Sequence, residues 1–365
     1  MTVGESICLV EANPMTTRER MLAVVRGEEH DRVPFVQYDN NGAPNEDAWA
    51  LLGRDNMGIL RWQSIHWWEH PNCRIESEEV YFDGRRGVRH TMHTPAGSLN
   101  EERIYQPTYG VEGYRTHFVK EPKDYAVLLA YLRDAVLHDN LDVIDQYNAQ
   151  LGDDGFCHVS VERTPYQQLW IEWVSLLDLG LHLVDCPDAI EEVTSVLAEN
   201  ERKIFQLVPR ARIPYIVIPD NLTAPAIGEK YFRQYCLPLY QELVGVCDEI
   251  GLPVYAHLDG DLKPVWKAIG ESGIRGIDSF SPPPDNDTSP AQAAAMWPEM
   301  RLCVNYPSSV HLREPEAIYR RTMEILNEAG HTGRLQIQIS ENVPPGLWRT
   351  SYPQIVRAIR DFGKP

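Results

Sequence analysis

Hydrophobic and polar positions follow a regular alternation along most of this chain. From about residue 121 onward, short apolar runs typical of buried strands take turns with longer segments whose apolar residues recur at helical spacing. An order of strand and then helix predicts a parallel sheet with helices on its outside. The expected strands are 156–163, 214–219, 253–258, 275–280, 301–306 and 335–341, and the expected helices are 165–180, 187–208, 229–250, 261–272, 313–329 and 351–362.

Two more strands are expected before this region, at 33–38 and near 57–62. With them the strand count reaches eight, which predicts an α/β fold of the (β/α)8 TIM-barrel type. A capping box at Thr16–Glu19 predicts the start of a first helix. Residues 1–14 show neither a helical nor a strand period and are expected to form a loose N-terminal extension. Residues 15–365 are expected to form a single TIM-barrel domain.

A β-rich insertion is expected near the N-terminus, at about 58–118, because short strand-like runs there are separated by turn sequences. The insertion could be a structural decoration or a lid over a site, and the sequence leaves both readings open. The expected strands are 75–81, 87–93 and 97–105, separated by Asp83-Gly84 and Pro95-Ala96-Gly97.

Nearly every expected barrel strand changes from apolar to polar at its carboxyl end. A single change of this kind is ordinary, because loops are polar. Seven strand ends that all carry a carboxylate or an amide predict a shared cavity, since barrel enzymes place their sites at this end. The residues are Asp39 and Asn40, Glu162 and Arg163, Asp220 and Asn221, His257 and Asp259, Asp278 and Ser279, Asn305 and Tyr306, and Ser340 and Glu341.

The most informative strand end is Val254–Gly260, which reads VYAHLDG. Residues two apart on a strand project to the same side, so His257 and Asp259 are expected to project together. An imidazole beside a carboxylate is typical of a metal site or of an acid/base pair. Structural roles compete with these: a histidine can simply be hydrogen-bonded, Glu341 can cap the next helix, and Asp220 can be an N-cap.

Composition and charge narrow the class of protein. The chain has 34 Lys and Arg against 53 Asp and Glu, a formal net charge of −19, which disfavours nucleic acid and anionic membranes as partners. No apolar run has the length of a membrane span, and the N-terminus lacks the form of a signal peptide, so a cytoplasmic protein is expected.

The seven cysteines include no C-x-x-C pair, and Cys303 is expected to be a buried core thiol. Motifs for nucleotide hydrolysis, nicotinamide binding and serine hydrolysis do not occur.

Several short motifs of this chain occur together in one known family. They are Arg18-Glu19-Arg20, Arg32-Val33-Pro34, Asp220-Asn221, Tyr231–Pro238, His257–Gly260, Gly273–Asp278 and Ile339–Pro345. On these motifs the chain resembles the uroporphyrinogen decarboxylase superfamily from Met15 to its C-terminus. The resemblance implies a TIM barrel and one of two branches of function.

The two branches differ in the residues that they place at the site. In the decarboxylases, N-terminal arginines hold the carboxylates of a tetrapyrrole. In this chain Asp39 stands where the first arginine is expected, and it would repel such a substrate. In the other branch, methyltransferases that work with corrinoid proteins bind zinc through His-x-Cys-Gly and a second Cys near the last strand. This chain keeps His257 and Gly260 and has Asp259 and Glu341 near the positions of the two thiols.

Carboxylates in place of thiolates change the expected chemistry. Thiolates suit soft metals, whereas carboxylates give a harder and more Lewis-acidic centre, and zinc accepts His together with Asp or Glu. Such a centre would suit an ether oxygen better than a thiol. We therefore expect a metal-dependent, O-demethylase-like methyltransferase that moves a methyl group between a small methoxylated or methylated substrate and a corrinoid or similar carrier.

The expected site residues follow from this function. His257, Asp259 and Glu341 would bind zinc or another divalent metal. Asp220 and Asp278, together with His257, are the expected catalytic residues, which orient the substrate or act as acid and base. The expected substrate-binding residues are Tyr38, Asp39, Trp62, Trp67, Asn221 and Asn305. The expected partners are the small-molecule substrate and a corrinoid protein.

Two alternatives stay open at the level of the sequence. The first is a metal-free decarboxylase or lyase that acts on a small carboxylic acid, with His257 and Asp220 handling protons. The second is a barrel that binds a corrinoid protein or another ligand without catalysis.

Overall fold

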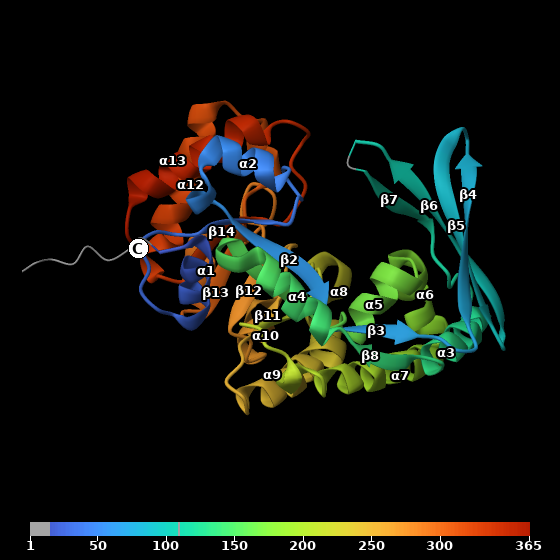
Figure 1. Cartoon of the computed structure of the whole chain (residues 1–365). Coiled ribbons are helices and arrows are strands. Elements are labelled where there is room, and N and C mark those ends of the chain that lie inside the picture. The colour runs from blue at the N-terminus through green and yellow to red at the C-terminus, as the bar shows by residue number, and fades with distance from the viewer. Residues whose placement is uncertain (1–14, 109) are drawn as a thin grey trace, which may run out of the picture.

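The computed structural model describes residues 15–108 and 110–365. Its centre is a closed barrel of eight parallel strands, in which β1 pairs with both β2 and β14 (Figure 1). The expected (β/α)8 barrel is therefore confirmed. Residues 1–14, predicted to be a loose extension, lie outside the described residues. The barrel strands, in spatial order, are β1 (Phe35–Tyr38), β2 (Gly58–Ser64), β9 (Gly155–Ser160), β10 (Ile216–Ile218), β11 (Val254–Ala256), β12 (Gly276–Phe280), β13 (Arg301–Asn305) and β14 (Leu335–Ile339).

The barrel interior is filled by side chains from alternate strand positions. Interior residues pack with Met21 and Val25 of α1 (Thr17–Arg26), which begins at the predicted capping box of Thr16 and Glu19. Cys303 belongs to this cluster and is 4% exposed, so the expected core thiol is confirmed. The interior cluster also contains Val36, Leu60, Phe156, Tyr215, Val217 and Tyr255. A packed interior leaves room for ligands only at the ends of the strands.

Helices surround the barrel, and two expected helices are each broken. The segment 165–180 divides at Val174, which is extended and forms a bridge with Val119. The segment 229–250 contains a π-helical turn at Phe232–Cys236. No described helix is long and apolar enough to cross a membrane. The helices after α1 are α2 (Asn45–Leu52), α3 (Tyr125–Arg133), α4 (Leu141–Leu151), α5 (Pro165–Gln168), α6 (Leu176–Asp185), α7 (Pro187–Phe205), α8 (Ala224–Tyr231), α9 (Leu237–Asp248), α10 (Trp266–Glu271), α11 (Pro290–Met296), α12 (Pro315–Ala329) and α13 (Trp348–Phe362).

The expected β-rich insertion forms two small sheets beside the barrel (Figure 1). Its three expected strands are confirmed, and a fourth, β7, was not predicted. The first turn lies at Asp83-Gly84, where both residues have positive φ, a conformation that glycine adopts readily. The larger sheet contains β4 (Arg74–Phe82), β5 (Arg85–Thr94), β6 (Gly97–Gln106) and β7 (Val111–Thr116), and the smaller one pairs β3 (His66–Glu69) with β8 (Val136–Asp139).

Candidate metal centre

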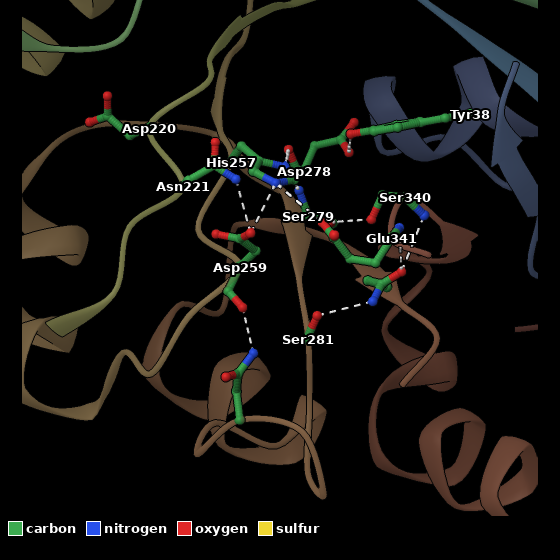
Figure 2. A network of polar contacts seen from close by, with 12 residues as sticks. Tyr38, Asp220, Asn221, His257, Asp259, Asp278, Ser279, Ser281, Ser340 and Glu341 are labelled. Atoms are coloured by element: carbon green, nitrogen blue, oxygen red, sulfur yellow. Dashed lines mark hydrogen bonds and ion pairs between the residues drawn. The ribbon is translucent and has the colours of Figure 1, made fainter. Parts of the chain in front are cut away.

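Three side chains that could hold a metal ion meet at the carboxyl end of the barrel (Figure 2). His257 follows β11, Asp259 lies two residues further on, and Glu341 follows β14. His257 Nε2 lies 3.5 Å from Asp259 Oδ2 and 3.7 Å from Glu341 Oε1. The main-chain N–H of His257 donates to Ile218 O at 2.9 Å. The pairing with β10 thus continues one residue past β11 and fixes the position of His257.

The other ring nitrogen of His257 is held by the main chain of β12. Nδ1 lies 3.0 Å from Asp278 O and 2.9 Å from Ser279 N. A protonated Nδ1 donates to the Asp278 carbonyl, whereas an unprotonated Nδ1 accepts from the Ser279 N–H, so β12 restrains the ring in either tautomer. This restraint directs Nε2 at the two carboxylates, as is usual for a metal-ligating histidine.

The three side chains have the spacing that a small divalent ion needs. Their ligand atoms all lie within 4.8 Å of one another, and no other such group occurs among residues 15–108 and 110–365. Two donors that are each about 2.1 Å from a zinc ion at a tetrahedral angle are about 3.4 Å apart. The two distances from His257 Nε2 are close to this value. Since zinc also accepts an imidazole together with carboxylates, the residues present fit a divalent metal.

Two carboxylates beside one buried imidazole make this site favour a positive charge. Burial lowers the pKa of His257, but the hydrogen bonds and charges of Asp259 and Glu341 outweigh burial and raise that pKa to about 10. Burial raises the pKa of Asp259, but the hydrogen bond and charge of His257 bring it below its usual value. A protonated imidazole or a bound metal ion can supply the positive charge that these carboxylates stabilise.

Two asparagines position the carboxylates of the triad. Asn221 Nδ2 donates to Asp259 Oδ2 at 2.9 Å, and Asn221 Oδ1 accepts from Arg163 at 2.9 Å. Asn305 Oδ1 accepts from the main-chain N–H of Glu341 at 3.3 Å. The sequence predicts both asparagines as substrate-binding residues. Their amide groups are engaged in these contacts, and a role in substrate binding stays a prediction.

Asp220, an expected catalytic residue, does not reach the triad. Its buried carboxylate accepts from the Thr164 N–H at 2.7 Å, from Thr164 Oγ1 at 2.8 Å and from the Tyr240 hydroxyl at 2.8 Å. The side chain points away from the triad in Figure 2. Since Thr164 is the N-cap residue of α5, Asp220 fixes the start of that helix. Asp220 thus lies apart from the triad, and its expected catalytic role stays a prediction.

Asp278, the other expected acid or base, lies buried in the barrel interior. Its carboxylate accepts from the Tyr215 hydroxyl at 2.9 Å and from Gln338 Nε2 at 2.6 Å, and it lies 3.2 Å from His158 Nδ1. Burial raises the pKa of Asp278, but the His158 charge and the hydrogen bonds bring it below its usual value. Asp278 contacts His257 through its main-chain carbonyl. Its main chain thus helps to position the candidate metal ligand, and its expected catalytic role stays a prediction.

An aromatic wall borders the candidate metal centre. The Trp62 ring lies 6.3 Å from the His257 ring, 4.5 Å from the His158 ring and 5.6 Å from the Tyr38 ring, between centroids. Trp62 is 38% exposed. It lines a cavity of about 550 Å³ together with Tyr38, Asp39, Arg61 and Tyr147. The cavity thus offers aromatic surface close to the triad.

Asp39 and Trp67, two further residues expected to bind substrate, have other partners. Asp39 lines the aromatic cavity, but its carboxylate is paired with Arg61 at 2.5 Å. Trp67 stacks on His138 with 4.3 Å between ring centroids and lies outside the cavities at the triad. The reason is that the chain leaves the barrel after Ser64, so Trp67 belongs to the small β3–β8 sheet. Trp67 thus lies apart from the triad, and its expected role in substrate binding stays a prediction.

A second cavity, of about 500 Å³, opens directly onto Asp259 and Glu341. Its wall is polar and also includes Ser281, Asn305 and Asp285. Of the described residues that line it, three are acidic and none is Lys or Arg. This cavity therefore repels an anionic ligand that has no metal ion to bind.

Polar residues inside the barrel support the site and were not predicted from the sequence. His158 lies on β9, Tyr215 directly precedes β10 and Gln338 lies on β14. All three contact the Asp278 carboxylate. One signal was present. Phe156, His158 and Ser160 occupy alternate positions of β9, so they share one face of the strand.

The fold and the site define a class of protein, a (β/α)8 barrel with a candidate metal-binding triad at the carboxyl ends of its strands. The family model for uroporphyrinogen decarboxylase (URO-D) matches residues 182–361, which span β10 to β14. The expected resemblance to this family is thus confirmed for that part of the chain.

Comparison with solved structures supports the same fold. A methyltransferase from Methanosarcina mazei superimposes with a TM-score of 0.56 at 14% sequence identity, over 95% of this chain and 99% of that chain. At this level of identity the likeness concerns the fold. No curated protein sequence matches the chain.

Proposed function

We propose that this protein is a metal-dependent methyltransferase that takes a methyl group from a small methoxylated or methylated substrate and passes it to a corrinoid or similar carrier. The observation that carries the proposal is the triad of His257, Asp259 and Glu341, whose ligand atoms lie within 4.8 Å of one another beside a cavity. The family match and the fold shared with a methyltransferase are consistent with this reaction.

In this proposal the triad holds zinc or another divalent ion. When bound, the ion would act as a Lewis acid toward the ether oxygen of the substrate. Asn221 keeps the Asp259 carboxylate in place, Asn305 keeps the Glu341 main chain in place, and β12 holds the His257 ring. Because these contacts already hold the candidate ligands in place, the site would need little rearrangement during the reaction.

The substrate would lie against the aromatic wall. The exposed Trp62 ring offers a stacking surface 6.3 Å from the His257 ring, and a methoxylated ring stacked there would place its oxygen near the triad. In the transfer, the bond between the methyl carbon and the ether oxygen breaks and its electron pair stays on the oxygen. A reduced corrinoid or similar carrier would supply the electron pair of the new bond to the methyl carbon, and the oxygen would take a proton from solvent.

The charge of the site argues against the alternative decarboxylase. A small carboxylic acid would meet Asp259, Glu341 and Asp285 in the polar cavity, with no Lys or Arg among the described residues that line it. In the aromatic cavity the only basic residue of the described lining, Arg61, is already paired with Asp39. An uncharged ether avoids this repulsion.

Zinc titration tests the metal centre, and a methyl-transfer assay tests the reaction. Chelator-treated protein should bind one Zn²⁺ per chain in isothermal titration calorimetry, and Asp259→Asn should bind it at least about tenfold more weakly. Zinc-loaded protein should also convert cob(I)alamin to methylcobalamin with ortho-methoxyphenol, as followed by visible absorbance, and His257→Ala should not.

Asp285→Asn is the matched control for zinc binding, because Asp285 lines the same polar cavity without joining the triad. It should bind zinc as the unaltered protein does. Equal zinc affinity in Asp259→Asn and Asp285→Asn would reject the metal centre. Methyl transfer that persists in His257→Ala would reject the triad as the reaction centre.

A further inference from the structure

A second acidic site lies away from the triad, in a cavity of about 180 Å³. The cavity lies beside the β3–β8 sheet. Its lining residues come mainly from β3, α3, α5, the π-helical turn Leu169–Trp173, α7 and the loop that follows β9. Three carboxylates and three aromatic side chains carry the argument, namely those of Glu162, Glu172, Glu201, Trp68, Tyr131 and Trp173. Of the described residues that line the cavity, none is Lys or Arg.

Glu201 is the unusual member of this cavity. Its side chain is 1% exposed, and neither carboxylate oxygen has a hydrogen-bond partner. Burying a carboxyl group without hydrogen-bond partners is costly even when the group is uncharged. The indole Nε1 of Trp173, in the same lining, is also buried without a partner. Unsatisfied polar groups in the wall of one cavity require an explanation, and a bound ligand supplies one.

The other two carboxylates stand at the open part of the cavity. The side chain of Glu162 is 31% exposed and pairs with His66 at 2.9 Å, and that of Glu172 is 27% exposed and pairs with Arg163 at 2.8 Å. Both have partners, whereas the deeper Glu201 has none. Burial and the charges of Asp220 and Glu162 raise the pKa of Glu201 well above its usual value. The free protein therefore holds this group protonated, and a cation that enters the cavity would favour loss of the proton.

Aromatic rings form much of the remaining wall. Tyr131 and Trp173 lie 5.9 Å apart between ring centroids at an angle of 57°, and Trp68 lines the same space. Faces of Trp and Tyr within about 6 Å attract cations, most strongly where water is displaced. Rings together with an unpaired carboxylate are typical of sites for organic ammonium groups.

The spacing of the three carboxylates argues against a metal ion in this cavity. Among the described residues, only His257, Asp259 and Glu341 bring three ligand atoms within 4.8 Å of one another. Glu162, Glu172 and Glu201 are therefore too far apart to coordinate one ion together. A volume of about 180 Å³ holds more than a single water, which occupies about 30 Å³ of the liquid, and is smaller than the roughly 300 Å³ of sites for larger ligands.

We propose that this cavity binds a compact organic ammonium cation, with Glu201 facing its charge and Trp68, Tyr131 and Trp173 facing its alkyl groups. The inference does not depend on the metal-dependent reaction, because no residue of the triad lines this cavity. Choline is a suitable probe, because its uncharged carbon isostere, dimethylbutanol, has nearly the same shape without the charge.

Titration calorimetry with choline chloride tests the proposal in the full chain. Choline should bind once per chain, and dimethylbutanol should bind at least about tenfold more weakly. Glu201→Gln keeps the shape of the side chain but cannot ionise in response to a bound cation, so choline affinity should fall about tenfold or more. This variant should keep the melting temperature, since the carboxyl group that it replaces is held protonated in the folded protein.

Glu199→Gln is the matched control, because Glu199 lies on the same helix with its side chain exposed, and it should bind choline as the unaltered protein does. Trp68→Leu provides a second test that leaves every carboxylate in place, and it should also weaken choline binding. Equal affinities for choline and dimethylbutanol would overturn the proposal. Unchanged choline binding in Glu201→Gln would overturn it as well.

Discussion

Two acidic clusters of this barrel differ in how closely their side chains approach. At the candidate metal centre, His257 Nε2 lies within 3.5 and 3.7 Å of two carboxylate oxygens. In the neighbouring cavity, the three glutamates are too far apart to share one ion, and aromatic rings line the same space. The comparison teaches that spacing, more than charge, decides which cation an acidic site can take.

The two clusters are also linked by hydrogen bonds. Glu172 pairs with Arg163 at 2.8 Å, Arg163 donates to Asn221 at 2.9 Å, and Asn221 donates to Asp259 at 2.9 Å. A change at one cluster can therefore reach the other through two side chains. Substitutions at one cluster therefore test whether cation binding at the other cluster changes.

The largest effect is expected from His257→Ala, because this substitution removes the only nitrogen ligand of the triad. Loss of a partner behind a metal ligand costs roughly 10–100-fold in affinity, so loss of the ligand itself should cost at least about 100-fold in zinc affinity. Choline binding should stay unchanged, since His257 does not line that cavity. Both affinities are measured by titration calorimetry. A variant that keeps zinc binding would show that His257 is not a ligand.

Substitutions of Asp259 test whether this residue is a ligand of the metal ion. Asp259→Ala should weaken zinc binding about 10-fold to several hundred-fold, which is about 1.4–3.5 kcal/mol. Asp259→Cys should keep or tighten zinc binding, because thiolates are strong zinc ligands, and it should change the substrate preference. Equal losses in the two variants, measured side by side with zinc, would mean that position 259 supports the fold rather than the metal.

A smaller effect is expected where the two clusters join. Asn221→Ala removes the hydrogen bond to Asp259 and should weaken zinc binding about tenfold. The exposed Asn342, which lines the polar cavity, provides the matched control Asn342→Ala, with no expected change. Zinc affinity that falls equally in both variants would contradict a positioning role for Asn221.

The pH dependence of stability tests the second cluster. Burial and the Glu162 carboxylate raise the pKa of Glu172 to about 7, against the opposing charge of Arg163. The folded protein then holds a proton that the unfolded chain releases at lower pH, so this group costs stability as the pH rises from about 5 through about 7. Glu172→Gln has no proton to lose. Its free energy of unfolding relative to the unaltered protein should rise across this window, on the order of 2 kcal/mol.

Chemical denaturation at about pH 5 and about pH 8 measures this difference. Glu192→Gln, at an exposed position of α7, should show no such trend with pH. A constant difference between Glu172→Gln and the unaltered protein at both pH values would show that Glu172 is already charged in the folded state.

The barrel and the meeting of the triad could be predicted because both follow from local patterns. Alternation of strands and helices gives the fold, and closure of the barrel brings the carboxyl ends of β11 and β14 together. His257 and Asp259 then stand two residues apart on one strand end, and Glu341 follows the last strand. The period of the strands and the family resemblance are therefore enough to predict the barrel and the meeting of the triad.

The placement of other side chains depends on tertiary contacts that no local pattern carries. Asp220 also stands at a strand end, but the N-terminus of α5 and the Tyr240 hydroxyl take up its carboxylate. Trp67 is five residues from Trp62, but the chain turns out of the barrel between them. The cavity around Glu201 is formed by segments far apart in the sequence, so no local pattern could have predicted it.

The most direct test of the central claim is the anomalous signal of zinc in a crystal of the protein soaked with the metal. The account predicts one strong peak at the carboxyl end of the barrel, within bonding distance of His257 Nε2, Asp259 and Glu341, at about 2.0–2.2 Å. A soaked crystal with no peak between these three side chains, or with zinc bound elsewhere, would contradict it.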